Sequence, residues 1–308
     1  MNINKKFLAA GLILSALTIS FPLINAEAAP ANNKNISAAQ TDSNWYFLSA
    51  DDKYGKFFEP GSVKVVKKVT TADGKEIPTE IEAWTKTTYT YEGAMLTIDN
   101  YDLRSILTDP QMLSYSLALL RINPQNRTIQ YAREDFYDAN GKLTWSTTDE
   151  KIKEINVQSF DEVFYAAIVD EVFRNGEMDR KNAKDRWIDL WNATDENGNT
   201  TTVTADTTTM RLKGSNLILW EWQETKNAEG KVIEIRFMKK AVNLSQGTEK
   251  ISTGDVWTPQ SAGWNTLEDE NGGAYKMIRG DAPEYKGLVR LRAFAKGYSN
   301  WVSRYSID

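Results

Sequence analysis

The chain has 308 residues, of which 41% are hydrophobic and 26% charged, and its formal net charge is −5. It contains neither histidine nor cysteine, which excludes serine–histidine triads, cysteine proteases, zinc hydrolases and disulfide-stabilised folds. The acidic balance argues against nucleic acid as a partner, because phosphate binding needs a concentrated positive field. We also expect no cofactor.

The first residues have the pattern of a secretory signal peptide. Lys5 and Lys6 precede an apolar stretch from Phe7 to about Ile24, and Ala26 and Ala28 offer an Ala-x-Ala cleavage site. Residues 1–28 are therefore expected to be removed, which makes the protein exported, either to the periplasm or to the cell surface and exterior. The alternative is a membrane anchor, for which this interrupted stretch is marginal. No integral membrane segment is expected after cleavage.

Residues 29–43 are small and polar and predict a disordered spacer. From Trp45 onwards, short segments, among them 114–123 and 128–137, alternate between apolar and polar residues and are bounded by Gly, Pro, Asn or Asp, as in half-buried strands. The turns at Asp73–Gly74 and Asn140–Gly141 have hairpin chemistry. Residues 44–175 are therefore predicted to form a first β-rich module, an antiparallel meander.

One helix of this module is predicted from Ser159 to about Phe173. Ser159 and Glu162 have the spacing of a capping box, an apolar stripe follows, and Gly176 lies just past the end. Such a helix would cover one face of the sheet.

The insert at residues 91–111 has no clear period. A plain connection, with a short helix at Leu103–Leu107 that Pro110 stops, is favoured over a lid.

A charged run at residues 176–185 predicts a linker, beyond which the strand pattern restarts. Residues 186–308 are predicted to form a second β-rich module. In this repeat the strand 217–224 corresponds to 80–87, so that Trp220 is the counterpart of Trp84. Residues 245–275 are expected to be irregular or weakly stranded. A helix that starts at Asp281 and Glu284, which have capping-box spacing, mirrors the first one, although Val289, Leu291 and Ala293 also alternate as in a strand. The predicted fold class is α+β: two tandem modules, each an antiparallel β-meander sheet with a helix packed on one face.

Several segments of the chain share a pattern with a known family: NWYFLS at 44–49, FFEPGSV at 57–63, EAWTKTTY at 82–89, YSLALLRIN at 115–123 and SFDEVFYAAIVDEVF at 159–173. Together they resemble the small secreted domains of the surface-adhesin protein E type, over residues 44–175 and less completely over 186–244. The resemblance implies an antiparallel sheet with a packed helix, and non-catalytic binding of host matrix or serum proteins at a bacterial surface. This chain departs from the group by lacking cysteine and by doubling the module, and no binding residue carries over.

Ten tryptophans suggest a second function, in which sugar rings of a glycan stack on aromatic side chains. Trp220 and Trp222 are two residues apart, so on a strand they share one face while Glu221 lies on the other. The alternative is that this pair lies beneath the helix of the module as core. Trp257 and Trp264 stand in polar loop context and are expected to be the more exposed pair.

Metal binding and catalysis are weaker hypotheses. The segments DENGN at 195–199 and DENGG at 269–273 offer oxygen ligands, but neither completes a calcium loop, and turn chemistry explains both. A carboxylate-dependent envelope hydrolase would need a paired acid and base. The candidate pairs are Glu134 with Asp135, and Glu221 with Glu224.

Overall fold

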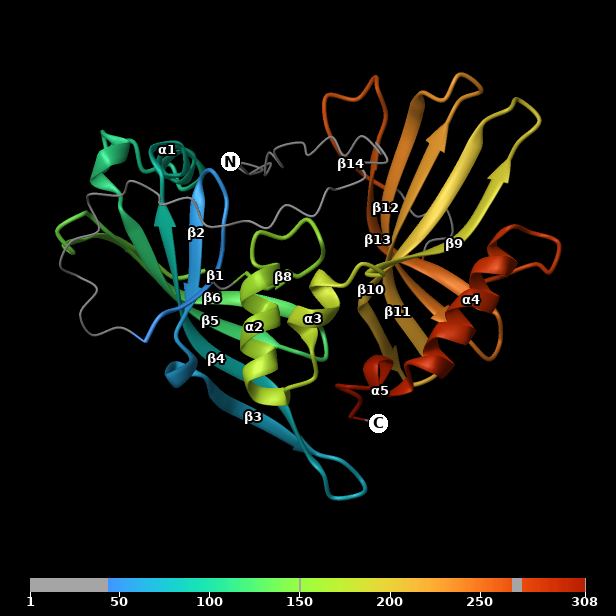
Figure 1. Ribbon diagram of the computed structural model, residues 1–308, viewed down its shortest axis with the longest axis horizontal. Coiled ribbons are helices and arrows are strands. Elements are labelled where there is room, and N and C mark those ends of the chain that lie inside the picture. Colours follow the sequence, from blue (N-terminus) through green and yellow to red (C-terminus); the bar gives the residue numbers. More distant parts are fainter. Residues whose placement is uncertain (1–43, 150, 268–272, 308) are drawn as a thin grey trace.

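A computed structural model describes residues 44–149, 151–267 and 273–307. These residues form two antiparallel sheets, one in each half of the chain, and helices lie against both of them (Figure 1). The predicted β-rich α+β class is confirmed. The predicted signal peptide and spacer lie outside the described residues.

The first sheet has eight strands within the described residues, and its main path runs β1-β2-β4-β5-β6-β7. Consecutive strands of this path lie side by side, as in a meander, while β3 pairs with β4 and β8 pairs with β6. The strands are β1 (Tyr46–Ala50), β2 (Tyr54–Phe58), β3 (Lys64–Thr70), β4 (Glu76–Tyr89), β5 (Tyr115–Asn123), β6 (Thr128–Tyr137), β7 (Leu143–Thr147) and β8 (Lys153–Glu154).

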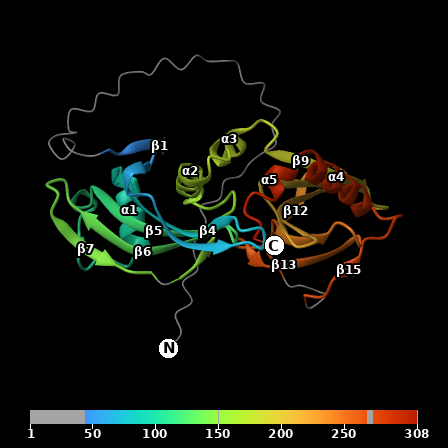
Figure 2. The same cartoon turned by 90° about the horizontal axis from the view of Figure 1, so that it is seen from below.

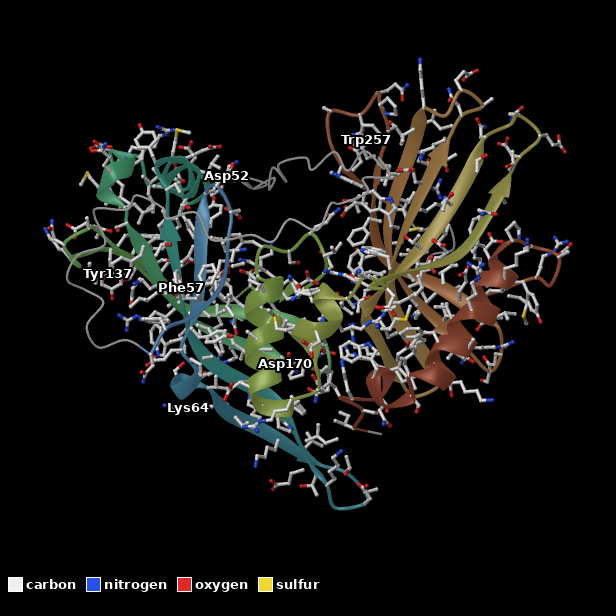
Figure 3. All side chains as sticks on the ribbon, in the orientation of Figure 1. Asp52, Phe57, Lys64, Tyr137, Asp170 and Trp257 are labelled. Atoms are coloured by element: carbon white, nitrogen blue, oxygen red, sulfur yellow. The ribbon has the colours of Figure 1, made fainter. Side chains whose placement is uncertain are left out.

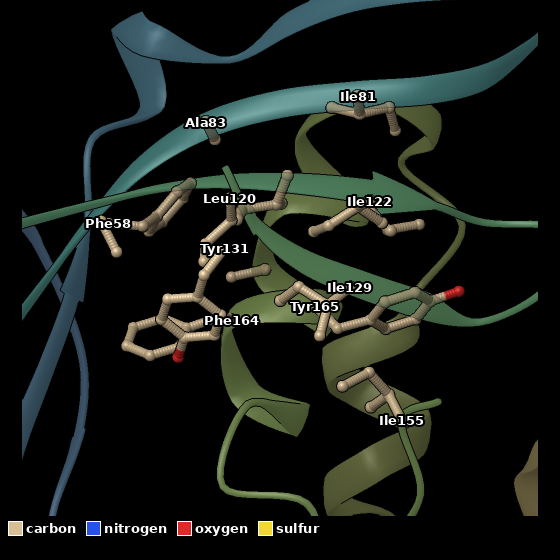
Figure 4. Close-up of a cluster of buried hydrophobic side chains, with 14 of the residues drawn as sticks. Phe58, Ile81, Ala83, Leu120, Ile122, Ile129, Tyr131, Ile155, Phe164 and Tyr165 are labelled. Carbon is tan, nitrogen blue, oxygen red and sulfur yellow. The ribbon is translucent and has the colours of Figure 1, made fainter. Parts of the chain in front are cut away.

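Alternation along these strands gives the first sheet one buried face and one open face. In β5 every second residue from Ser116 to Ile122 is buried, as the period of a strand requires. The helix α2 (Glu162–Phe173) lies on the buried face, where Phe164 and Tyr165 pack against Ile81, Leu120 and other strand residues (Figure 4). Each such side chain contributes about 1.5–3 kcal/mol by leaving water, so this cluster is the core of the first half.

The insert at 91–111 contains a helix that the sequence did not predict, α1 (Tyr91–Asn100). Its N-cap is Thr90, whose hydroxyl accepts a hydrogen bond from the Gly93 N–H at 3.3 Å. Leu103 and Leu107, expected in a short helix, instead flank a turn at residues 104–106 and are buried beside Phe136. The insert therefore covers the far end of the same buried face.

The second sheet has seven strands within the described residues, in the order β14-β13-β12-β11-β10-β9, with β15 paired to β13. The strands are β9 (Trp187–Thr194), β10 (Thr200–Lys213), β11 (Asn216–Lys226), β12 (Val232–Asn243), β13 (Thr248–Trp257), β14 (Asn265–Thr266) and β15 (Lys276–Met277). The expectation that 245–275 is irregular was wrong for β13, a ten-residue strand that pairs along β12.

The helix α4 (Glu284–Gly297) covers one face of the second sheet and is followed by α5 (Ser299–Val302). Leu288 and Leu291 pack with Leu217 and Leu219 of β11. Gly287 is at the contact with β9, because a Cβ there would lie 2.9 Å from the ring of Trp191. The residue that weakens the helix by propensity is thus the one that lets it approach the sheet.

Seen from below, α2, α3, α4 and α5 lie together along one side of the molecule, with β5, β6 and β13 on the other (Figure 2). The open faces of the two sheets therefore look away from these helices.

Two boundaries differ from the prediction. The helix α2 begins at Glu162, because the hydroxyl of Ser159 accepts from the Asn156 N–H at 2.9 Å and does not cap the helix. Residues 176–185, expected to be a linker, contain α3 (Glu177–Asn182), and the side chain of Glu177 is completely buried.

Buried charged side chains join the two halves in a region that we call the junction. Arg127, in the turn between β5 and β6, donates to Glu162 at 3.1 Å, to Glu177 at 3.2 Å and to the carbonyl of Thr208 in β10 at 3.2 Å. Arg186 bonds both Glu162 and Asp206. These contacts fix the second sheet against α2 and α3.

Candidate functional site

The open face of the second sheet, opposite α4, carries a row of aromatic side chains. The rings of Trp220 and Phe237 stack with centroids 4.5 Å apart, and Trp222 lies 6.0 Å from Phe237 and 5.9 Å from Trp264. Trp222 and Phe237 are partners across β11 and β12, and partners in antiparallel strands point to the same face. We call Trp220, Trp222, Phe237 and Trp264 the aromatic row.

Trp220 and Trp222 share a face, as the sequence predicted, and that face is not the one beneath the helix. Leu217 and Leu219 occupy the helix side of β11. Trp220 is nevertheless only 5% exposed, because it lies at the junction, where its Nε1 donates to Glu154 of β8 at 3.4 Å. Phe237 is only 1% exposed, whereas Trp222 is half-buried, so of these three rings only that of Trp222 reaches the surface.

Trp257 and Trp264, expected to be the more exposed pair, are both half-buried. Trp264 joins the aromatic row through Trp222. Trp257, labelled in Figure 3, is the last residue of β13 and pairs with Ile235, which places it on the same open face. The structure thus brings three of the four predicted tryptophans into one row and puts the fourth on the same face.

The larger of two cavities, with a volume of about 330 Å³, lies where the open faces of the two sheets meet, and the smaller, of about 250 Å³, lies against Val302 and the C-terminal residues 305–307. Both are lined by Asn123, Asn126, Arg211 and Lys213, so they adjoin, and together we call them the junction groove. Lys239 lines the larger cavity and is the strand partner of Trp220. The junction groove is therefore continuous with one end of the aromatic row.

Glu154 is the acidic side chain at this meeting point that contacts the second sheet. Its carboxylate accepts from Lys239 at 2.6 Å, from the indole of Trp220 at 3.4 Å and from Arg211 at 3.5 Å. A single carboxylate thus faces three donors of the second sheet, which ties β8 to the open face.

A second cluster of ionisable groups is buried inside the first half. Tyr101 donates to Glu134 at 2.7 Å, and Tyr131 donates to Asp161 at 2.5 Å. Burial raises the pKa of Glu134 to about 7, although the hydrogen bonds from Tyr101 and Ser116 oppose the shift. Of the four residues in this cluster, the sequence analysis singled out only Glu134, because Tyr101 and Asp161 lie far away from it along the chain and Tyr131 carries no local signal.

Shifted pKa values often mark functional sites, but they also arise in structural networks. Neither cavity of the junction groove is lined by Glu134, Asp161, Tyr101 or Tyr131. Their polar atoms bond one another, so we assign this cluster to the stability of the first half.

The two carboxylate pairs considered for hydrolysis are each divided between opposite faces of a strand. Glu134 is the strand partner of Ala118 on the buried face, and Asp135 points the other way. Glu221 bonds Lys240 at 2.8 Å on the helix side, while Glu224 is on the open face. Members of one pair cannot flank the same bond.

The predicted turn chemistry at 195–199 is present. The carboxylate of Asp195 accepts from the backbone N–H groups of Asn197 and Asn199 and from the side-chain amide of Asn199. Residues 269–272 of the second segment lie outside the described residues. Within the described part of the chain, no three Asp or Glu side chains gather closely enough to hold a metal ion.

No helix among the described residues has the length and apolarity needed to cross a bilayer.

No protein-family model, curated protein or solved structure matches this chain. Function must therefore be inferred from the chemistry of the site itself.

Proposed function

We propose that this chain is an exported, non-catalytic protein that binds carbohydrate on the open face of its second sheet. The observation that carries the proposal is the pair of partly exposed rings of Trp222 and Trp264, packed on the buried Phe237 and Trp220, beside a groove of amide and charged side chains. The face of an aromatic ring is electron-rich and attracts the C–H groups of a sugar, while sugar hydroxyls need polar neighbours. Both requirements are present side by side.

Export is part of the proposal and is supported by the basic and apolar pattern of residues 1–28. Either the periplasm or the exterior fits this pattern. A non-catalytic role is supported by the division of the carboxylate pairs between opposite faces.

We also propose that the two halves are related modules. In both, consecutive strands form a meander that a helix then covers, α2 in the first half and α4 in the second. Trp84, the predicted counterpart of Trp220, also lies on the open face, since its neighbour Ala83 is buried beneath the helix.

A second candidate function is binding of a host matrix or serum protein, as the sequence resemblance implies. β3 is exposed along its whole length and includes Val65, Val66 and Val69. It projects with part of β4 as a ribbon (Figure 1), and no other described strand pairs with it. An extended segment of a partner could add to this edge through backbone hydrogen bonds.

The test is a glycan array probed with the chain from residue 29 onwards, followed by affinity measurement from tryptophan fluorescence. Replacing Trp222 and Trp264 together by alanine should weaken binding roughly tenfold or more, because each ring contributes about 1 kcal/mol beyond its buried area. Trp45→Ala, a half-buried tryptophan in the first half, is the matched control and should leave the affinity unchanged.

Unchanged glycan affinity in the Trp222→Ala, Trp264→Ala double variant would refute the carbohydrate proposal. Binding to a matrix protein that is lost in Val66→Lys and retained in the tryptophan double variant would instead favour the second candidate.

A further inference from the structure

Arg211 is the least satisfied cation of the junction. It comes from β10, is 4% exposed, and lines both cavities of the junction groove. Its Nη1 donates to the carbonyl of Thr209 at 3.1 Å and its Nη2 to the carbonyl of Asn126 at 3.2 Å, while Glu154 is 3.5 Å away. Its Nε has no hydrogen-bond partner among the described residues.

A buried donor without a partner is costly, by about 1–3 kcal/mol. The other buried arginines of the junction do not share this condition, since Arg127 contacts two carboxylates and Arg304 donates its Nε to Glu177 at 2.7 Å. Burial lowers the pKa of Arg211, and the nearby carboxylate of Glu154 offsets this only in part. Arg211 therefore has capacity for another anionic oxygen.

The charge of the groove also favours an anionic ligand. The larger cavity is lined by four cationic side chains, Arg121, Arg211, Lys213 and Lys239, and by two anionic ones, Glu80 and Glu154. The lining of the groove is therefore positively charged, whereas the protein as a whole has a formal net charge of −5.

Gln125 supplies a complementary group. It lines the smaller cavity, its Nε2 donates to the carbonyl of Pro78 at 2.8 Å, and its buried Oε1 has no partner among the described residues. A free acceptor near a free charged donor fits a ligand that has both a hydroxyl group and an acidic group.

We propose that the junction groove binds an acidic sugar, a uronate or a phosphorylated sugar, with the Nε of Arg211 donating to its anionic group and the Oε1 of Gln125 accepting from a hydroxyl. A hydrogen bond from a guanidinium to an ionised oxygen is stronger than one between neutral groups. This inference rests on the proposed carbohydrate function and specifies its ligand class: the partly exposed rings of Trp222 and Trp264 stack the sugar rings, and the groove selects the charge.

The test compares hexamers of galacturonate, alginate and hyaluronan with their methyl esters, which keep the shape and lose the charge. Affinity is measured by calorimetry at ~0.15 M salt, where attraction between exposed charges is screened. The acid form should bind roughly 10- to 100-fold more tightly than its ester, the range expected for charged hydrogen bonds. Competition by galacturonate, galactose 6-phosphate and galactose then separates a carboxylate from a phosphate, and both from a neutral sugar.

Two variants and a control assign the effect to the groove. Arg211→Gln should bring the acid and the ester to the same affinity. Glu154→Gln keeps an acceptor for Trp220 but removes the carboxylate that competes for Arg211. It should tighten binding of the acid severalfold. This variant still tests the inference if Arg211→Gln does not fold. Arg279→Gln, which removes an exposed cation paired with Asp281, should change nothing.

Equal affinity for acid and ester, with binding still dependent on Trp222 and Trp264, would overturn this inference and leave the proposed function standing. Absence of binding to any acid or ester would overturn this inference, and absence of binding on the glycan array as well would overturn the proposed function with it.

Discussion

Replacing Glu177 by glutamine should destabilise the protein by about 3–5 kcal/mol, the range for removing one partner of a buried ion pair. The Glu177 carboxylate accepts from Arg304 at 2.7 Å, from the hydroxyl of Tyr305 at 2.6 Å and from Arg127 at 3.2 Å, and its side chain is completely buried. Glutamine has the same shape, so packing is preserved. Its amide nitrogen, however, would direct a donor toward a guanidinium, and Arg304 would keep only carbonyl oxygens such as those of Thr208 and Met210.

The measurement is urea unfolding of both proteins, followed by circular dichroism and tryptophan fluorescence. Coinciding transitions would justify a single free energy of unfolding. Glu76→Gln is the matched control, because Glu76 pairs with Lys68 at the surface and such pairs contribute about 0–1 kcal/mol. A loss below about 1 kcal/mol for Glu177→Gln would refute the view that this network holds the halves together.

The Glu177 network also has a pH signature. Burial alone would raise the pKa of Glu177, but Arg304 and Arg127 lower it below its usual value. A depressed carboxyl pKa contributes stability that is present above the unfolded-state pKa and is lost as the pH falls through the folded-state pKa. The free energy of unfolding should therefore fall less steeply with decreasing pH in Glu177→Gln than in the native chain, in urea unfolding repeated at decreasing pH.

Two further predictions concern the interior. Burial raises the pKa of Glu134 to about 7, so the folded state retains a proton that the unfolded state releases, and native stability should fall by at most about 3 kcal/mol between pH ~4.5 and pH ~7. Glu134→Gln should flatten that part of the stability profile in thermal unfolding from pH 5 to pH 8, and parallel profiles would contradict the assignment. Gly287→Ala should destabilise by about 1–3 kcal/mol in urea unfolding, because its Cβ would press on Trp191. Gly297→Ala in the same helix, where nothing lies within 4 Å, should be neutral or slightly stabilising, and equal effects at the two glycines would contradict the contact.

Much of the sheet architecture could be predicted because strands with one buried face have a period of two. The segments 114–123 and 128–137 nearly coincide with β5 and β6 for this reason. The helix α1 was missed because its core face is made by small residues such as Gly93 and Ala94, which give a weak apolar stripe. Local pattern detects large buried side chains better than small ones.

The candidate site was predictable only in part. Spacing along β11 placed Trp220 and Trp222 on one face, but the meeting of that face with the first sheet depends on β8 and on Arg211, which are far apart along the chain. Glu177 looked like a linker residue because a charged run predicts solvent exposure. Nothing local reveals that Arg127, fifty residues away, will neutralise it.

The position of Tyr305 has a consequence for the order in which the protein is completed. Its ring packs on Phe173 with centroids 4.9 Å apart, and its hydroxyl accepts from Asn175 and donates to Glu177, so a residue of the second half belongs to the core of the first. During synthesis the first half therefore lacks part of its interior until residues 304 and 305 have left the ribosome. We expect the first half to be less stable until the second is complete, which would suit the proposed export, because an exported chain passes through a translocation pore before it folds.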